Sequence, residues 1–284
     1  MRRTATSLLP LLLLLLLCLP PLAAALEPLP DSALAKVAGR DGMSFNLSNF
    51  AVNGNATWRY YTPAGSSLKL GNLSASRSDN LDAPFADPYR LDVLPGGPGG
   101  ADIVNIALPQ NAAGREAWQV AVDLGVDADG VSVNVGSVIL KDLVYYGGGV
   151  QFSTPAVGDG LAFGLSTRFD LGSLTLAPNG RDATGPAMVL SKLSVGAATT
   201  DGSAPTQPWR IADVAGQAGI FNARTDEAGN PGLHVGIGWP DVNAAQAGTL
   251  QIGNISFQSS AGNVDLGSSR IGTIQLQYLD VKFH

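Results

Sequence analysis

From Met43 onward, apolar residues recur at every second position of the chain, separated by polar or small residues. The segments Val131–Val135 and Leu161–Leu165 are clear examples. A period of two is typical of β-strands that bury one face. Turn signals such as Asp129-Gly130 and Asn179-Gly180 separate these segments. The pattern therefore predicts antiparallel strands joined by tight turns from residue 43 to the end of the chain.

A short motif recurs six times within this pattern and predicts kinked strands. It reads apolar-x-apolar, then Gly or Ser, then Asn, Ser or Lys, then apolar-x-apolar, and its copies begin at residues 45, 68, 133, 169, 188 and 250. A weaker seventh copy occupies residues 271–276. The apolar positions advance by two, then three, then two, so a regular strand would turn the second half to the wrong face. One extra residue restores the facing, as a β-bulge does, and we expect bulges with positive φ at Gly71, Gly136, Gly172 and Gly253.

The spacing between the copies bears on the architecture. It is irregular, which disfavours a strict solenoid, while kinked strands curl a sheet over. The proline-rich stretch 83–100 is expected to be a long loop, because similar strand patterns lie on both sides of it. We therefore predict an all-β fold of antiparallel, kinked strands in a sandwich or closed barrel, with residues 43–284 as a single β-rich domain.

The first residues of the chain have the pattern of a signal peptide. Arg2 and Arg3 precede the apolar run Leu8–Leu17, and Ala23 and Ala25 provide the small residues that signal peptidase reads. The apolar run is too short for a typical transmembrane helix. We predict a signal peptide over residues 1–25, with cleavage after Ala25. Cys18 follows a leucine, which does not fit the small residue that lipidation requires.

Residues 26–42 are predicted to form a short helical lead segment. Asp31 is a suitable N-cap, Leu34 and Val37 have helical spacing, and Gly39 stands where a helix C-cap is expected. The fold class is thus all-β with one short N-terminal helix.

Composition and charge restrict the classes of protein and partner. Charged residues make up 14% of the chain, against about 25% in an average domain, and the apolar content of 45% excludes a disordered chain. The 35 glycines and 18 prolines exclude a long coiled coil. Removal of residues 1–25 leaves no cysteine and changes the net charge from −6 to −8, with 15 basic and 23 acidic residues. Such a chain suits the periplasm, outer membrane or cell surface of a Gram-negative bacterium, and its charge argues against nucleic acid as a partner.

Catalytic motifs are sparse. The chain has two histidines, His234 and the terminal His284, and it contains neither a GxSxG nor an HExxH motif. His234 alternates with apolar residues, so we interpret it as an outward-facing strand residue. We predict no catalytic residues and no cofactor.

Three aspartates leave a metal site open. Asp123, Asp127 and Asp129, followed by Gly130, resemble a fragment of a calcium loop, although its terminal glutamate is missing. The Asp129-Gly130 pair is also a strong hairpin signal. We favour the hairpin and keep calcium as the alternative.

The segment Leu26–Phe45, LEPLPDSALAKVAGRDGMSF, resembles the opening of a family of secreted proteobacterial proteins. Members of this family begin with a Leu-x-x-Leu-x-Asp-x-x-Leu-x-x-Val-x-Gly-Gln-Asp-Gly-Ile-like stretch, and some are labelled pilus-system proteins of the Fil type. The chain departs from that stretch at Arg40, where Gln is usual, and at Met43, where Ile is usual. Segments 233–240 and 277–283 are also similar to the family. The resemblance implies export and an envelope or surface role, and it transfers no catalytic residues because the family has none established.

Two function classes follow from these observations. The first is a non-enzymatic surface or envelope protein with a structural or interaction role linked to pilus or adhesion, whose partners are other envelope or pilus proteins. The second is an outer-membrane β-barrel, which the alternating residues Leu279, Val281 and Phe283 near the C-terminus favour. The terminal His284 and the 7% aromatic content argue against the barrel.

Overall fold

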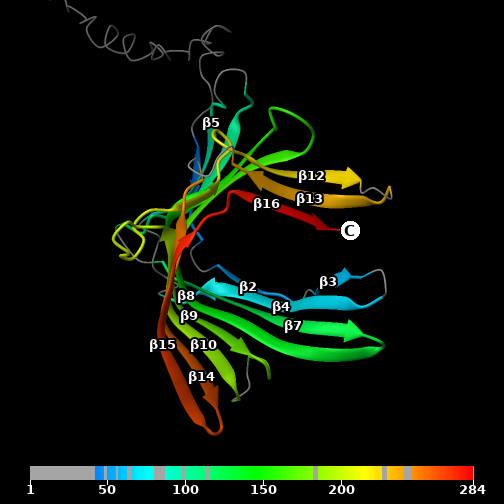
Figure 1. The fold of residues 1–284 in the computed structure, drawn as a ribbon, viewed down its shortest axis with the longest axis vertical. Coiled ribbons are helices and arrows are strands. Elements are labelled where there is room, and N and C mark those ends of the chain that lie inside the picture. Colours follow the sequence, from blue (N-terminus) through cyan, green and yellow to red (C-terminus); the bar gives the residue numbers. More distant parts are fainter. Residues whose placement is uncertain are drawn as a thin grey trace, which may run out of the picture. The chain divides into compact units, whose positions relative to one another are not determined.

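A computed structural model describes residues 42–47, 50–55, 57–62, 65–79, 87–96, 100–112, 116–181, 185–225, 229–239 and 245–283. Residues 41–284 form one compact unit. Every regular element among the described residues is a β-strand, and all pairings are antiparallel (Figure 1). The predicted all-β, antiparallel class is therefore confirmed. The predicted signal peptide and nearly all of the predicted helical segment 26–42 lie outside the described residues.

The strands have the following bounds: β1 Met43–Phe45, β2 Ala51–Asn53, β3 Trp58–Tyr61, β4 Ser67–Arg77, β5 Tyr89–Leu94, β6 Ile103–Ala107, β7 Trp118–Ala128, β8 Val131–Ser153, β9 Leu161–Ala177, β10 Ala187–Ala197, β11 Trp209–Ala212, β12 Gly219–Thr225, β13 Pro231–Gly238, β14 Gly248–Ser259, β15 Gly262–Ile274 and β16 Tyr278–Phe283. They form one branched sheet whose main path runs β1-β5-β6-β8-β9-β10-β14-β15. The prediction of a long loop over residues 83–100 is wrong, because this stretch contains β5, which pairs with β1 and β6. Tyr89, Leu91 and Val93 alternate with polar residues between Pro88 and Pro95, so the prolines flank a strand.

The two long strands β8 and β9 divide this sheet into two strand groups. The first part of β8 pairs with β7 and its last part with β6, while β9 pairs first with β11 and β12 and then with β10. The first strand group contains β2, β3, β4, β7, β10, β14 and β15, and the second contains β1, β5, β6, β11, β12, β13 and β16. β8 and β9 pair with each other through both groups.

Glycines allow β8 to pass between the groups. The register with β9 shifts between Tyr145 and Gly148. Gly147 and Gly148 have φ of 80° and 87°, a conformation that other residues rarely adopt. A Cβ atom on Gly148 would overlap the backbone carbonyl of Ser166 on β9. At this point, therefore, the fold requires glycine for both its φ and its lack of a side chain.

The motif copies that begin at residues 68, 133, 169, 188 and 250 each lie inside a single strand, as predicted. The copy at 45–52 does not, because it begins at the end of β1 and ends in β2. The motif's glycines also have a different role from the expected one. Of Gly71, Gly136, Gly172 and Gly253, the only one with positive φ is Gly136, at 117°. The expectation of positive φ at the other three is wrong. The left-handed residues are instead neighbours or partners of the glycines: Asn72, Asp142 and Lys192, with φ of 51°, 56° and 54°.

The pairing register explains why glycine is needed there. In the pairing of β8 with β9, Asp142 lies opposite Gly172. In the pairings of β10 with β9 and with β14, Lys192 lies opposite Gly172 and opposite Gly253, respectively. A Cβ atom on Gly172 would lie 2.9 Å from Cβ of Asp142, and one on Gly253 would lie 2.8 Å from Cβ of Lys192. The glycines thus make room for left-handed residues on the adjacent strand. A register shift, the mark of a bulge, occurs at Gly71 against β7, at Gly136 against β7 and near Gly253 against β15. At Gly172 the pairing keeps its register with both β8 and β10, so the bulge expected there is wrong.

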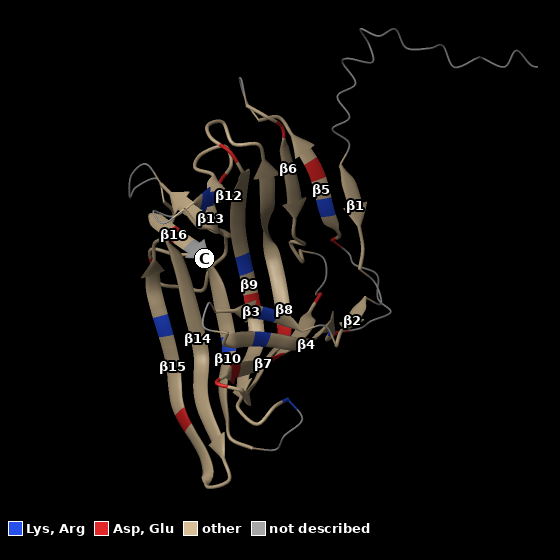
Figure 2. Cartoon of the chain, turned by 90° about the vertical axis from the view of Figure 1, so that its right-hand side faces the viewer, with Lys and Arg blue, Asp and Glu red and all other residues tan. Residues whose placement is uncertain are grey.

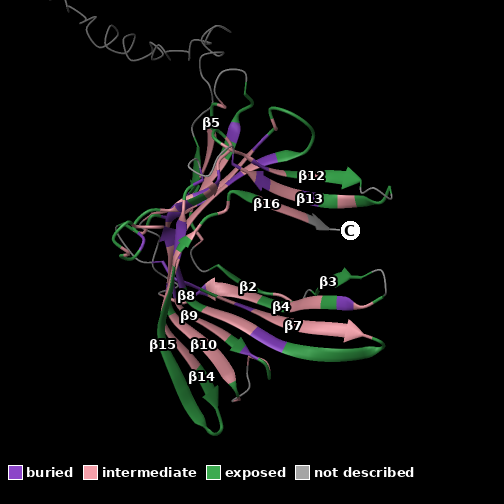
Figure 3. Ribbon diagram, viewed as in Figure 1, coloured by how far each residue is buried: buried purple, intermediate pink, exposed green. Residues whose placement is uncertain are grey.

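Because the motif copies of β9, β10 and β14 align with one another, their apolar residues form continuous rows, which leucines of β8 extend. One row is Leu140, Leu174, Leu190 and Ile255, and the next is Leu143, Leu171, Leu193 and Ile252, both across β8, β9, β10 and β14. Leu143, Leu171, Leu193 and Trp118 form the buried core of the first strand group. A separate core in the second group consists of Ala212, Ile237, Trp239 and Ala245. Each fully buried leucine contributes about 1.5–3 kcal/mol, and buried segments are present in both strand groups (Figure 3).

Candidate functional site

The free ends of the hairpins in the first strand group include exposed segments (Figure 3), and large apolar side chains are among the exposed residues. Tyr60, Leu68, Val126 and Val133 lie opposite one another across β3, β4, β7 and β8, so all four point to one face. Val133 is 52% exposed and its neighbour Val131 is 60% exposed. We call the exposed residues of this face, Trp58, Tyr60, Leu68, Val131, Val133 and Val135, the apolar hairpin surface.

The opposite face of the same hairpins is polar and charged. Lys69 forms an ion pair with Asp127 and donates a hydrogen bond to the hydroxyl of Ser132. These contacts, led by the hydrogen bond from Lys69, lower the pKa of the Asp127 carboxyl to about 2. The hairpins are thus amphipathic, and large apolar side chains are exposed on one of their two faces.

The three aspartates singled out as calcium candidates have separate roles. Asp123 accepts hydrogen bonds from Asn72 and Ser137 and forms an ion pair with Arg181. Burial by itself would raise the pKa of Asp123, but these three contacts outweigh it and lower the pKa below its ordinary value. Asp127 is engaged by Lys69, as described above.

Asp129 has a conformational role. Asp129 and Gly130, with φ of 51° and 75°, form the two-residue turn between β7 and β8, so the predicted hairpin is present. No group of three or more His, Cys, Asp or Glu side chains suited to a metal occurs in the described part of the chain.

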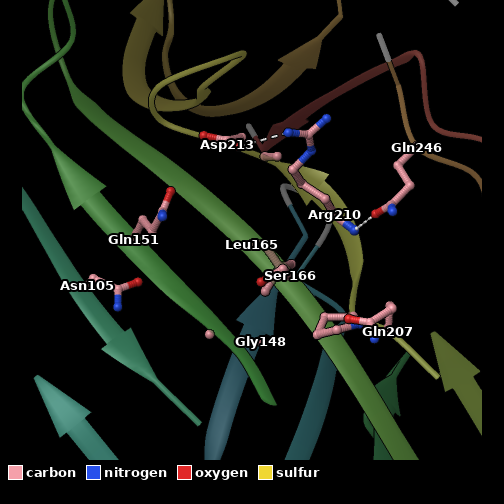
Figure 4. A pocket seen from close by; sticks show the side chains of 12 residues that line it. Asn105, Gly148, Gln151, Leu165, Ser166, Gln207, Arg210, Asp213 and Gln246 are labelled. Carbon is pink, nitrogen blue, oxygen red and sulfur yellow. Dashed lines mark hydrogen bonds and ion pairs between the residues drawn. The ribbon is translucent and has the colours of Figure 1, made fainter. Parts of the chain in front are cut away.

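A polar cavity of about 560 Å³ lies beside the point where β8 passes between the strand groups (Figure 4). Its lining includes the amides Asn105, Gln151, Gln207 and Gln246, together with Ser166, Arg210 and Asp213. The backbone N–H of Arg210 donates a hydrogen bond to Oε1 of Gln246 at 2.6 Å. The guanidinium of Arg210 lies 3.2 Å from Oδ2 of Asp213. The charges of Arg210 and Asp213 balance, so the cavity offers hydrogen bonds to neutral polar groups. Its lining residues come from widely separated segments and have no linear motif.

His234 is not the outward-facing residue that the alternation predicts. It is only 6% exposed, because it lies on the central strand of β12-β13-β16. Its Nδ1 is 2.9 Å from Oδ1 of Asn222, and its Nε2 is 2.6 Å from Oδ1 of Asp280. The ring lies beside Gly236, which has no side chain to displace it. Both ring nitrogens are occupied, so neither is left to activate a serine for catalysis.

A buried polar cluster that the sequence analysis did not single out surrounds Glu116. Tyr89 and Trp118 both donate hydrogen bonds to Oε1 of Glu116, at 3.1 and 2.5 Å. Oε2 of Glu116 is buried and has no hydrogen-bond partner in the described residues. Arg77 is equally buried and forms two hydrogen bonds with Asp79, at 2.7 and 2.6 Å. The only hint in the sequence is that charged residues are rare in this chain.

Burial raises the pKa of the Glu116 carboxyl, and the hydrogen bonds from Trp118 and Tyr89 only partly oppose that rise. A carboxyl with a raised pKa in the folded state loses stability as the pH rises through that value. Between the ordinary pKa of glutamate and the raised pKa, the free energy of unfolding of the wild type falls as the pH rises, and that of Glu116→Gln lacks this fall. We therefore expect the difference in favour of Glu116→Gln to grow with pH over this range and to stay constant above it. Urea unfolding of both proteins at several pH values measures this, and a difference that falls with rising pH would contradict it.

No family model, curated protein or solved structure matches this chain. The resemblance to the Fil-type family therefore stays a prediction. Within the described residues, no helix has the length and hydropathy needed to cross a lipid bilayer.

Proposed function

We propose that this protein is exported to the envelope or surface of a Gram-negative bacterium and acts there by contact with other envelope or pilus proteins, in a structural or adhesive role. The observation that carries the proposal is the apolar hairpin surface. Exposed apolar side chains gathered on one face mark interaction sites more often than scattered ones do. The signal-peptide pattern of residues 1–25 supports export.

A role without catalysis is supported by the polar groups of the molecule. His234 is held between Asn222 and Asp280. The cavity beside β8 is lined by amides and by one balanced pair, Arg210 and Asp213. These groups suit binding and structure better than proton transfer. The net negative charge supports partners other than nucleic acid.

The experiment compares adhesion or pilus assembly in cells that lack the gene and in cells that carry variants. We expect the deletion to lose the phenotype, and Val131→Ser combined with Val133→Ser to reduce it strongly. Val157→Ser is the matched control, because Val157 is 90% exposed and lies in the loop between β8 and β9, outside the apolar hairpin surface. His234→Gln, which preserves hydrogen bonding, is expected to retain the phenotype.

Three results would contradict the proposal. They are an unchanged phenotype in the deletion strain, an equal loss in the Val157→Ser control, and a hydrolytic activity of the purified protein that disappears in His234→Gln.

The alternative is an outer-membrane β-barrel. The finer fold prediction, a sandwich or closed barrel, also stays a prediction. A carbonate wash of the membrane fraction separates the two functions, because a contact protein is released and an integral barrel is retained.

A further inference from the structure

β15 is a long strand with a free edge. It spans 13 residues and, among the described strands, it pairs with β14 alone (Figure 1). Residues 262–271 are all exposed (Figure 3). Natural proteins protect such edges with lysine, proline or a very short strand. β15 has none of these, although Gly267, with φ of 79°, accompanies a register shift against β14. Among the described residues, no strand pairs with the outer backbone N–H and C=O groups of β15, so these groups can pair with another strand.

The side chains of β15 fit a partner with one apolar and one polar face. Val264 lies opposite Phe257, and Ile271 lies opposite Leu250, so both continue the apolar rows of the sheet. Val264 is 57% exposed and Ile271 is 50% exposed, because the rows end at this strand. A further strand would cover them.

The charged residues of β15 lie on the polar face. Asp265 and Arg270 are the only charged residues of the strand (Figure 2). Asp265 lies opposite Ser256, where it also accepts a hydrogen bond from Asn254, and Arg270 lies opposite Gln251. Because the strand has one acidic and one basic residue near its middle, two copies of it paired antiparallel can place each acidic residue opposite a basic one. The edge is therefore self-complementary.

We propose that β15 pairs antiparallel with β15 of a second copy of this chain across a two-fold axis. With the axis between residues 267 and 268, Asp265 faces Arg270 of the partner subunit, and Val264 faces Ile271 of the partner subunit. This register uses residues 262–273 of each copy, nearly the whole strand. Opposite charges and apolar pairs directly across an antiparallel ladder both stabilise it, and the contact is isologous and closed.

The length of β15 favours a second copy over another edge of the same protein. The other end of the main path, β1, has three residues, and the end strands β2, β3 and β16 have three, four and six. None of these provides a ladder as long as β15 does. This inference goes beyond the proposed function, since it holds wherever the protein is located.

The test is the oligomeric state of the purified protein, measured by sedimentation velocity over a range of concentrations. The wild type is expected to be a dimer in equilibrium with monomer. Arg270→Asp and Asp265→Arg each replace two attractive contacts by two repulsive ones and should weaken the dimer about tenfold or more. The double variant Asp265→Arg/Arg270→Asp restores both contacts and should restore the dimer. Arg224→Asp, the same charge change at an exposed position of β12, is the control.

Circular dichroism of each variant confirms that it folds. A wild type that stays monomeric at all concentrations overturns the proposal. Assemblies larger than a dimer would indicate heterologous pairing between different edges, which also overturns it. A dimer that both single reversals leave intact, or that the double variant does not restore, would show that β15 is not the interface.

Discussion

Replacing Gly148 by alanine is expected to lower the free energy of unfolding by about 3 kcal/mol or more. Two costs add at this position. The φ of 87° is strained for any residue with a side chain. The new Cβ would also overlap the carbonyl of Ser166, which is backbone and part of the β8–β9 ladder, so it cannot move aside cheaply.

Urea unfolding followed by tryptophan fluorescence measures this loss. Gly130→Ala is the matched control, because Gly130 has a similar φ of 75° but nothing within 4 Å of the added Cβ. The control should lose about 1 kcal/mol, the cost of left-handed strain alone. Equal losses in the two variants would contradict the close passage of β8 against β9 at Gly148.

The second large effect is expected at Arg77. Arg77→Leu should lower the free energy of unfolding by about 2 kcal/mol, because it removes a buried guanidinium and leaves the carboxylate of Asp79, which is 20% exposed, without its partner. The side chain of Arg77 is only 2% exposed, and it donates two short hydrogen bonds to the carboxylate of Asp79. The desolvated carboxyl of Glu116 also loses a nearby positive charge.

The matched control is Arg59→Leu. The Arg59 side chain is 46% exposed, and its nearest carboxyl oxygen, on Asp127, is 4.0 Å away. Exposed pairs contribute about 0–1 kcal/mol, so this variant should unfold nearly as the wild type does. A loss at Arg77 no larger than the loss at Arg59 would show that the buried cluster is not needed for stability.

The strands could be predicted from the sequence because their signals are local. The period of two locates them, and the six-copy motif correctly predicts that residues such as Leu171 and Leu174 share a face despite an odd spacing. The sequence could not show which residue adopts the left-handed conformation. At Gly172 that residue is Asp142 on the neighbouring strand, and the pairing of β8 with β9 decides this.

The functional features depend on contacts between distant segments, so most of them could not be predicted. His234 is buried because β12 and β16 flank its strand, which the alternation around it does not reveal. Buried Glu116 accepts hydrogen bonds from Tyr89 and Trp118. The lining of the cavity beside β8 includes residues as far apart in the sequence as Asn105 and Gln246. The hairpin at Asp129 was predictable, because a two-residue turn is a local structure.

The central claim, that the protein is exported and acts by contact outside the cytoplasm, is tested most directly by chemical labelling of cells. Cells with a permeabilised outer membrane and an intact inner membrane are treated with a membrane-impermeant amine reagent. The labelled chain is then recovered, and its N-terminal peptide is identified by mass spectrometry. We predict a labelled chain that begins at Leu26. A chain that stays unlabelled until the inner membrane is broken, and that begins at Met1, would contradict the claim.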